Sequence, residues 1–342
     1  MCVKVLSKYL AVILCVYYSC VNKIPVKGEF ELINYIKKSY GLSAIGDDCA
    51  VLPKDDKTDM VITADMLVED IDFRLEWTTP EFLGHKALAV SLSDIAAMGA
   101  EPKWAMITIG VPEKLWESDF IKRFYEGWTE LAIEFDVQLI GGDISRSPDK
   151  FFVDSIVGGE VPKGNAVLRS GANAGDAIFV SGRLGGAAGG LRLLEKTDDR
   201  GASEDWKQRL MERQLRPTPR IELGKYLRDS SVASAMIDVS DGLSSDIHHI
   251  CEESAVGAEL DASLLPIDED LKTFLDPDEL LPLALNGGED FGLLFTVPAE
   301  KISLLKNDDV SQIGTITQNT GVVELRDGER TIALQPSGYR HF

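Results

Sequence analysis

The sequence contains few of the side chains that build zinc sites, disulfides or histidine-dependent nucleophiles. It has five cysteines and four histidines among 342 residues. Cys49 and Cys251, the two cysteines beyond the first 22 residues, lack metal-binding or redox spacing, and the histidines form no zinc motif. These absences argue against a zinc enzyme and against a Ser-His-Asp or Cys-His hydrolase, and they indicate a reduced, cytoplasmic protein.

Basic residues are also scarce. Lys and Arg number 35 against 56 Asp and Glu, so the formal net charge is −21. This charge disfavours nucleic acid or an anionic membrane as a partner, whereas a phosphate ligand is compatible if cations neutralise it. The sequence has no P-loop lysine motif and no protein-kinase signature, so those cations would chiefly be metal ions.

A long apolar segment is absent as well. The nearest approach is Leu10–Tyr18, which resembles part of a signal peptide but is short for a membrane span and precedes no clear cleavage site. Either the segment is a targeting signal, or translation begins further in and residues 1–27 are a poorly ordered extension. The second interpretation is favoured, because the globular pattern starts only at Gly28.

The rest of the chain has the composition of an ordinary globular protein, 44% hydrophobic and 27% charged, and its length suits two domains. A polar connection that begins at Pro162-Lys163-Gly164 predicts the boundary. We therefore expect an atypical extension over residues 1–27, a first domain over residues 28–162 and a second over residues 163–342.

One stretch predicts a helix whose limits follow from its residues. Thr79 can cap it, Pro80 suits the first helical position and Gly99 ends it. Asp94 lies on an apolar, small-residue face of this helix, with no Lys or Arg three or four residues away. A buried carboxylate normally protonates, pairs or binds metal, so Asp94 needs either a distant arginine or a cation.

Further acids occur where ligand sites are usually built, at the ends of predicted strands and in turns. They are Asp48, Asp65, Asp143, Asp238 and Asp241. Carboxylates that converge on one cleft repel one another unless hard cations lie between them, and Mg²⁺ prefers one or two carboxylates together with waters and phosphate oxygens. The acids therefore predict a magnesium nucleotide as the ligand.

The glycine-rich segment from Gly182 to Gly190 has two interpretations. It can present backbone N–H groups to a phosphate at a helix start, or it can be a tight strand-to-helix turn. Periodicity predicts further helices over residues 29–38 and 116–135, and strands over residues 60–65, 104–111, 137–143, 151–161, 176–182 and 291–297.

Five motifs together resemble the thiamine-monophosphate kinase family, whose superfamily includes aminoimidazole ribonucleotide synthetase and selenophosphate synthetase. They are Ile45–Ala50, Leu92–Ala100, Leu139–Asp143, Ile237–Leu243 and Gly287–Phe291. The resemblance extends from Gly28 to Phe342. It implies a two-domain α/β (α+β) PurM-like fold, with an N-terminal mixed-sheet domain that binds ATP and magnesium and forms a homodimer, and a C-terminal α/β domain.

The resemblance also implies roles for individual residues. Several Mg²⁺ ions would be held by Asp48, Thr63, Asp65, Asp94, Asp143, Asp238 and Asp241. ATP would contact Gly142, Asp143, Arg169 and Ser240, and the substrate would contact Asp72, Glu289 and Tyr339. The catalytic residues among these would be Asp94, Asp143 and Asp241.

The implied reaction is direct, in-line transfer of the ATP γ-phosphoryl group to thiamine monophosphate, which gives thiamine diphosphate and ADP. An anionic acceptor phosphate needs positioning and charge neutralisation more than a strong base, which fits this set of residues. Two alternatives are a selenophosphate synthetase-like enzyme and a nucleotide- and metal-binding sensor without catalysis. The first is disfavoured because no cysteine occurs in a glycine-rich loop near the start of the globular region.

Residues 70–74 depart from the family pattern, because Asp72 stands where relatives commonly carry a histidine before the phenylalanine. If this stretch is a strand, Arg74 lies on the same face as Asp72 and neutralises its charge. The other interpretation is that the stretch has shifted away from the pocket.

Overall fold

The computed structural model describes residues 28–42, 44–196, 204–307 and 309–341. By compactness the chain divides into two units, Met1–Ser43 with Arg340–Phe342, and Ala44–Tyr339. The described part of the first unit is mainly helix α2 (Glu29–Tyr40), which ends at Gly41 in the left-handed conformation, so the expected helix over residues 29–38 is confirmed. The expected extension over residues 1–27 lies outside the described residues. In the described ranges no helix has the length and hydropathy of a membrane span.

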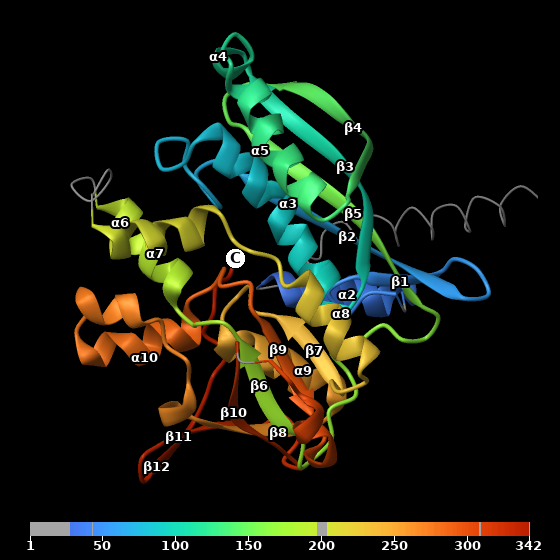
Figure 1. The fold of residues 1–342 in the computed structure, drawn as a ribbon, viewed down its shortest axis with the longest axis vertical. Helices are drawn as coiled ribbons and strands as arrows, with labels where there is room; N and C mark the ends of the chain where they lie inside the picture. Colours follow the sequence, from blue (N-terminus) through green and yellow to red (C-terminus); the bar gives the residue numbers. More distant parts are fainter. Residues whose placement is uncertain (1–27, 43, 197–203, 308, 342) are drawn as a thin grey trace, which may run out of the picture. The chain divides into compact units, whose positions relative to one another are not determined.

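The second unit contains two sheets (Figure 1). The first has five strands in the order β1-β2-β5-β3-β4, which pair antiparallel except for β3 with β4. Its strands are β1 (Ala50–Pro53), β2 (Thr58–Val68), β3 (Glu101–Pro112), β4 (Gln138–Ser147) and β5 (Phe152–Pro162). The helices of this half are α3 (Pro80–Ala97), α4 (Glu113–Trp116) and α5 (Phe120–Glu134). Thus α/β structure with a mixed first sheet is confirmed.

The second sheet has seven strands in the order β12-β11-β8-β10-β6-β9-β7. They are β6 (Ala177–Ser181), β7 (Ala235–Asp238), β8 (Gly257–Asp261), β9 (Leu293–Val297), β10 (Val310–Thr317), β11 (Val323–Asp327) and β12 (Arg330–Ala333). The α-helices between them are α6 (Gly186–Glu195), α7 (Asp205–Leu215), α8 (Ile221–Asp229), α9 (Leu243–Ser254) and α10 (Pro277–Asn286). Short 3₁₀ helices are η2 (Ala262–Leu264), η3 (Glu269–Thr273) and η4 (Ala299–Leu304). The predicted boundary after Pro162 falls between the two sheets, and the division into domains there stays a prediction.

Helix α3 runs through the interior of this unit, and its predicted limits are confirmed. The Thr79 hydroxyl accepts a hydrogen bond from the Phe82 N–H (3.2 Å), Pro80 is the first helical residue, and Gly99 has φ +62° just beyond the end. Every residue from Leu83 to Ala97 except Asp94 is buried. The helix therefore has no solvent-exposed side of its own along this length, which explains why its residues are apolar or small all round.

Two close backbone contacts fix α3 between its neighbours. A Cβ atom on Gly84 would lie 1.9 Å from the carbonyl oxygen of Phe124 in α5. A Cβ atom on Gly224 in α8 would lie 2.1 Å from the carbonyl oxygen of Ala96. Only glycine allows these helices to approach so closely, so α3 is held on one side by α5 and on the other by α8.

Three expected elements differ from the structure. The helix predicted over residues 116–135 is present as α5 but begins only at Phe120, because the chain turns at residues 117–119 after the short helix α4, and there the Ser118 hydroxyl accepts a hydrogen bond from the Phe120 N–H (3.1 Å). The strand predicted to end at Asp143 continues to Ser147. Residues 70–72 form a turn rather than a strand, with Asp70 at φ +73°. The strands predicted over residues 60–65, 104–111, 151–161, 176–182 and 291–297 are present as β2, β3, β5, β6 and β9 with small shifts in their ends.

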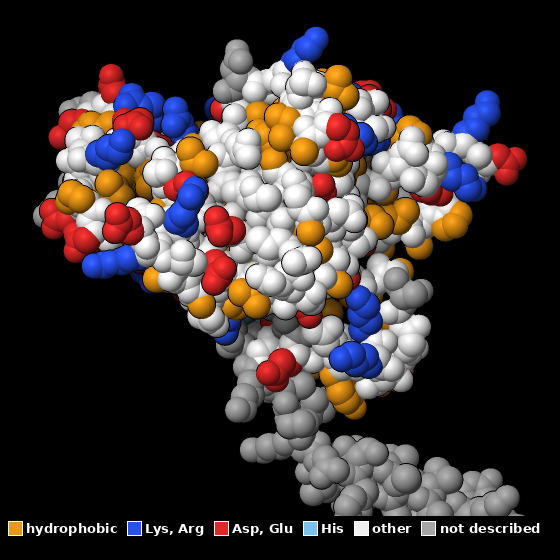
Figure 2. All heavy atoms as spheres, turned by 90° about the horizontal axis from the view of Figure 1, so that it is seen from below, with side chains coloured by type: hydrophobic (Ala, Val, Ile, Leu, Met, Phe, Trp, Pro, Cys, Tyr) orange, Lys and Arg blue, Asp and Glu red, His pale blue; other side chains and the backbone are white. Residues whose placement is uncertain are grey.

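The surface of the described residues on the side drawn in Figure 2 carries its hydrophobic side chains in small separate groups. Lysine, arginine and acidic side chains lie among and around these groups. Scattered apolar side chains of this kind are ordinary on a folded surface and do not by themselves mark a docking site.

Candidate active site

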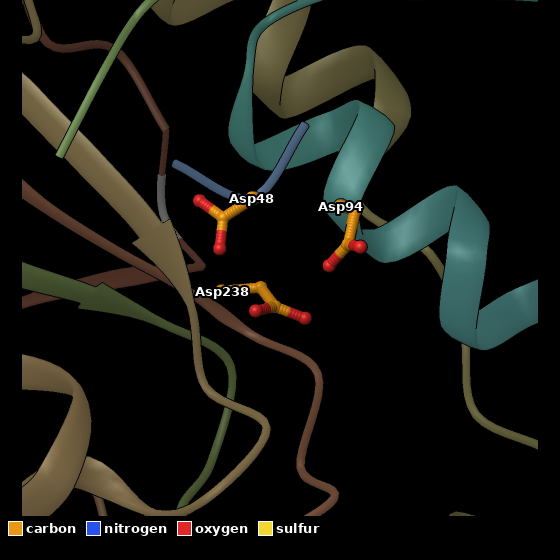
Figure 3. Close-up of side chains that lie close together, drawn as sticks. All are labelled: Asp48, Asp94 and Asp238. Atoms are coloured by element: carbon orange, nitrogen blue, oxygen red, sulfur yellow. The ribbon is translucent and has the colours of Figure 1, made fainter. Parts of the chain in front are cut away.

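Three carboxylates from distant parts of the sequence meet beside α3 (Figure 3). Asp48 precedes β1, Asp94 lies on α3, and Asp238 ends β7. One oxygen atom from each lies within 4.8 Å of the others. We call these three residues the acid cluster. Convergence of these three sequence-predicted residues is the central geometric feature of the site.

Hydroxyl groups surround the acid cluster. The Thr63 hydroxyl donates to Asp94 Oδ2 (2.5 Å), and the Ser93 hydroxyl donates to Asp238 Oδ2 (2.5 Å). On β2, two residues after Thr63, Asp65 accepts a hydrogen bond from the Ser91 hydroxyl (2.8 Å). Thr63 and Asp65 are two residues apart on β2, so alternation along the strand places their side chains on the same face. Both side chains therefore contact residues of α3, Thr63 with Asp94 and Asp65 with Ser91.

The acid cluster carries more negative charge than its neighbours compensate. Burial, with repulsion from Asp65, Asp238 and Asp48, raises the pKa of Asp94 well above its ordinary value. Burial is also the main cause that raises the pKa of Asp238 to about 7 and that of Asp65 to about 6. The pKa of Asp48 is raised by burial, although Arg169 opposes the shift. Ionising all of these groups together requires a cation.

Arg169 is the cationic side chain that pairs with the acid cluster. Its Nη2 donates to Asp48 Oδ1 (2.6 Å), and its backbone N–H donates to Asp47 (2.8 Å). The other carboxylate oxygen of Asp48, Oδ2, is buried and has no hydrogen-bond partner among the described residues. A buried carboxylate oxygen without a hydrogen-bond donor is what a hard metal ion would satisfy, so the oxygen-rich donor set fits Mg²⁺.

The loop between β7 and α9 forms backbone hydrogen bonds with both predicted substrate residues of the second half. The Ser240 carbonyl accepts a hydrogen bond from the Glu289 N–H (2.8 Å), and the Asp241 carbonyl accepts one from the Tyr339 N–H (3.0 Å). The structure therefore brings the predicted nucleotide residue Ser240 next to the predicted substrate residue Glu289. Asp241 lies in the same loop and is partly buried.

Asp143 and Gly142 lie elsewhere, on the edge strand β4. Asp143 is exposed and pairs in register with Thr108 of β3. It is not a member of the acid cluster. The expectation that Asp143 ends its strand is wrong, because the two preceding glycines continue the strand instead of terminating it.

Two residues that the sequence reasoning missed hold Glu289. Lys86 Nζ lies 2.8 Å from Glu289 Oε1, and Gln214 Nε2 donates to Glu289 Oε2. The Lys86 side chain is only 3% exposed. A lysine within a run of buried helical residues is rarely without a carboxylate partner, and that was the available signal.

Asp290 resolves the two interpretations of the glycine-rich segment. Its carboxylate accepts hydrogen bonds from the backbone N–H groups of Gly185 (2.5 Å) and Ala187 (3.0 Å). The N-terminus of α6 is thus satisfied by a side chain of the protein itself. The structure therefore favours the tight strand-to-helix turn over a phosphate-binding loop.

The reasoning about Asp72 and Arg74 needs correction, because it assumed a strand. The turn at residues 70–72 lets the Asp72 carboxylate accept a hydrogen bond from the Val68 N–H (2.7 Å). The Arg74 guanidinium lies over the Trp77 ring, 4.6 Å from its centroid. The two residues do not share a strand face.

Comparison with known proteins identifies similar chains over nearly the whole length. Residues 46–161 match the AIR synthase related protein N-terminal domain, and residues 173–326 match the C-terminal domain of that family. The thiamine-monophosphate kinase of Bacillus subtilis is 40% identical over 92% of this chain and 99% of its own. The Escherichia coli enzyme of that name is 40% identical over 87% of this chain and 91% of its own.

Solved structures agree with these relatives. One described as AaThiL complexed with AMPPCP and TMP has a TM-score of 0.83 and 36% identity, and covers 94% of this chain and 100% of its own. The thiamine-monophosphate kinase of Stenotrophomonas maltophilia has a TM-score of 0.72 and 39% identity, and covers 87% of this chain and 96% of its own.

Proposed function

The chain belongs to the thiamine-monophosphate kinase family of AIR synthase-related proteins, and from this premise we propose that it phosphorylates thiamine monophosphate with ATP, giving thiamine diphosphate and ADP. The observation that carries the proposal is the acid cluster, in which buried carboxylates exceed the cations that neutralise them. A site of this kind binds cations, and cations are what two phosphate-bearing substrates need in order to approach one another.

Within the proposal, different residues of this chain bind the metal ions, the nucleotide and the acceptor. Mg²⁺ supplies neutralisation of phosphate charge when it is bound. Within the proposal the acid cluster holds such ions, with Thr63 and Asp65 beside it and Asp143 and Asp241 as further ligands. Arg169, Gly142 and Ser240 contact the nucleotide, and Glu289 and Tyr339 contact the acceptor.

Phosphoryl transfer in this site needs positioning more than proton removal. An oxygen of the acceptor phosphate forms a bond to the γ-phosphorus of ATP, and the bond from that phosphorus to the β–γ bridging oxygen breaks to release ADP. The acceptor oxygen is already anionic at neutral pH, so no side chain has to remove a proton from it. The contribution of the protein is to fix the two groups in line.

We also propose a homodimer, supported by the edge of the first sheet. Strand β4 is an edge strand and is exposed over nearly all its length, with Leu139, Ile140 and Ile144 exposed by 41%, 52% and 50%. Exposed apolar edge strands recruit a partner strand or sheet. Light scattering should give a mass near twice 37.5 kDa, and a clean monomer would contradict the proposal.

The test of function is formation of thiamine diphosphate from ATP, Mg²⁺ and thiamine monophosphate, followed by chromatography. Excess chelator should abolish product, and restored Mg²⁺ should recover it. ADP release must depend on thiamine monophosphate, because a nucleotide sensor would bind ATP without this dependence. Recovery of no diphosphate product from folded protein would refute the assignment.

A further inference from the structure

The first turn of α9 carries three consecutive polar side chains to which the proposed reaction gives no role. They are Ser244, Ser245 and Asp246, and their exposed fractions are 0%, 7% and 1%. The Ser244 hydroxyl donates to Asn286 Oδ1 (2.7 Å), and the Ser245 hydroxyl accepts a hydrogen bond from the Gly338 N–H (3.1 Å). The two buried serines therefore anchor the segments that lead to the predicted substrate residues.

Asp246 binds a different segment, the loop that contains Asp241. Its Oδ2 accepts a hydrogen bond from the Gly242 N–H (3.1 Å). That N–H belongs to the peptide group between Asp241 and Gly242, and the carbonyl oxygen of the same peptide accepts a hydrogen bond from the Tyr339 N–H (3.0 Å). Because a peptide group is planar and rigid, holding it at both ends fixes the direction in which Asp241 projects its side chain.

The peptide group before Asp241 is held as well. The Ser240 carbonyl accepts a hydrogen bond from the Glu289 N–H (2.8 Å). On the other side, Gly242 has φ +115°, and a Cβ atom there would lie 2.9 Å from the carbonyl carbon of Asn286. Of the three hydrogen bonds that hold this loop, the bond to Asp246 is the one made by a side chain, so substitution can remove it.

A helix cap alone does not require a carboxylate at Asp246. Serine, threonine or asparagine can accept an N–H group at the start of a helix without burying a charge. Burial, with repulsion from Asp241 and Asp238, raises the pKa of Asp246 well above its ordinary value. The carboxylate is therefore costly at this position, and such costs are concentrated at functional sites. Its advantage is a stronger hydrogen bond, because an ionised acceptor holds an N–H group more firmly than a neutral one.

We propose that Asp246 is a positioning residue, which directs the Asp241 carboxylate towards the metal site by holding the Gly242 N–H. This inference rests on the proposed function, in which Asp241 is a metal ligand. Asp241 lies three residues after Asp238 of the acid cluster, so rotation of the peptide between Asp241 and Gly242 changes how the two carboxylates lie relative to each other. Asp246 acts through that peptide and not by contact with the metal or a substrate.

Two substitutions of Asp246 differ in whether this hydrogen bond can form. Asp246→Ala removes it and should lower kcat about 30-fold, because a misdirected ligand no longer stabilises the transferring phosphate. Asp246→Asn keeps an acceptor oxygen and should lower kcat only about threefold. The Mg²⁺ concentration that gives half-maximal rate should rise about tenfold in Asp246→Ala, whereas the KM for thiamine monophosphate should stay within about threefold of the parent. An Asp246→Asn variant as impaired as Asp246→Ala would overturn the proposal.

A control substitution removes a similar bond elsewhere. Asp59 is 8% exposed and accepts a hydrogen bond from the N–H of another glycine, Gly164 (2.8 Å). Asp59→Ala should lower the melting temperature without changing kcat. If Asp246→Ala does not fold, Asp246→Ser replaces it, because the serine hydroxyl is one bond shorter and can bond the carbonyl one helical turn back. Parental kcat in the folded variant without the Gly242 bond would refute the proposal.

A double-variant cycle separates positioning from a general loss of structure. If Asp246 acts through Asp241, adding Asp246→Ala to Asp241→Asn should lower kcat less than about twofold further, measured as single turnovers at high enzyme concentration. A purely structural role would lower kcat by the same factor in both backgrounds. That result would contradict the positioning role.

Metal binding distinguishes failure of this proposal from failure of the assigned reaction. Mn²⁺ takes oxygen ligands as Mg²⁺ does, and electron paramagnetic resonance follows its binding to the full chain in the presence of ADP. Asp246→Ala should weaken Mn²⁺ binding about tenfold, Asp241→Asn at least as much, and Asp59→Ala not at all. If the parent makes no thiamine diphosphate but this pattern is found, the positioning role stands and the assigned reaction falls. If the parent is active and Asp246→Ala binds Mn²⁺ as the parent does, the positioning role falls alone.

Discussion

The acid cluster and the Lys86–Glu289 pair are two charged groups along the same helix, and they differ in how their charge is compensated. In the acid cluster, Asp48 pairs with Arg169. Among the described residues, the side chains that donate hydrogen bonds to Asp94 and Asp238 are hydroxyl groups, and the pKa values of both acids are raised mainly by burial. Glu289 instead receives a buried lysine and an amide. The difference separates carboxylates whose charge the described side chains leave largely uncompensated from one that the protein itself satisfies.

The largest effect expected from this comparison is on catalysis. Asp94→Asn should lower kcat by at least about 100-fold, because it removes a hard ligand where phosphate charge is neutralised. It should not lower the melting temperature of the metal-free protein, since it relieves repulsion among buried carboxylates. Asp55→Asn, at an exposed loop, is the control for the substitution itself. Steady-state kinetics and thermal melts measure both effects, and near-parental turnover would show that Asp94 is not a metal ligand.

Asp143→Asn and Asp241→Asn extend this test to the two other proposed catalytic acids. Each should also remove most of the activity if these residues bind metal. Because Asp143 is exposed on β4, its substitution should leave the stability of the metal-free protein unchanged. Parental turnover in Asp143→Asn would remove this residue from the metal set without affecting the acid cluster.

The compensated pair should respond in the opposite way, with a loss of stability. Lys86→Met leaves Glu289 without its cation, and we expect a loss of about 2 kcal/mol in the free energy of unfolding. This is less than the 3–5 kcal/mol typical of a fully buried pair, because Glu289 is 29% exposed. Urea denaturation measures the loss. The double variant Lys86→Met with Glu289→Gln should recover most of the stability but not the affinity for thiamine monophosphate, and an equally unstable double variant would contradict the role of the pair.

A smaller effect is expected from pH on the metal-free protein. The folded-state pKa of Asp238 is about 7 and that of Asp65 about 6, against 3.8 for an ordinary aspartate, so the folded state binds more protons than the unfolded state between about pH 4 and pH 7. The contribution of these groups to stability is complete below pH 4 and is lost as the pH rises through 6 to 7. Thermal melts in chelator should show this decline, less of it in Asp238→Asn, and Mg²⁺ should offset it. An identical pH profile for the parent and Asp238→Asn would contradict the shift.

The smallest effects are expected at Asp72, which belongs neither to the acid cluster nor to the Lys86–Glu289 pair. Asp72→Ala removes one hydrogen bond to a backbone N–H, worth about 1 kcal/mol, and should leave the KM for thiamine monophosphate within about twofold of the parent. Arg74→Ala removes the guanidinium that lies over the Trp77 ring and should likewise leave this KM within about twofold of the parent, and neither change should alter ATP binding. A clear rise in the KM for thiamine monophosphate in either variant would show that the turn at residues 70–74 contacts the acceptor.

Local signals predicted much of this structure. Thr79, Pro80 and Gly99 define α3 through capping and backbone preferences, which depend on neighbours in the chain. The acids of the acid cluster could be recognised because Asp94 stands on an apolar helix face. The end of the strand was wrongly predicted at Asp143 because the glycines before it permit a strand as well as a turn. The position of Asp72 depends on Asp70 taking a positive φ, which a non-glycine residue seldom adopts.

The pairing of Lys86 with Glu289, which lie far apart in the sequence, could not be predicted in the same way. Lys86 and Glu289 are brought together only by the packing of α3 against segments from the second half of the chain. No periodicity or motif spacing encodes such a pair. The sequence shows a charged residue in an apolar helix, but the tertiary structure decides whether its partner is a side chain or a ligand.

The glycine contacts at both sides of α3 fix the position of that helix along its axis. With Gly84 against α5 and Gly224 against α8, α3 has no room to slide along its axis, because its ridges are seated in the backbones of its neighbours. Lys86 and Asp94 are eight residues apart, which is about 12 Å along the axis. Because α3 cannot slide, the Lys86–Glu289 pair and the acid cluster keep this separation, and each can be altered by substitution without moving the other.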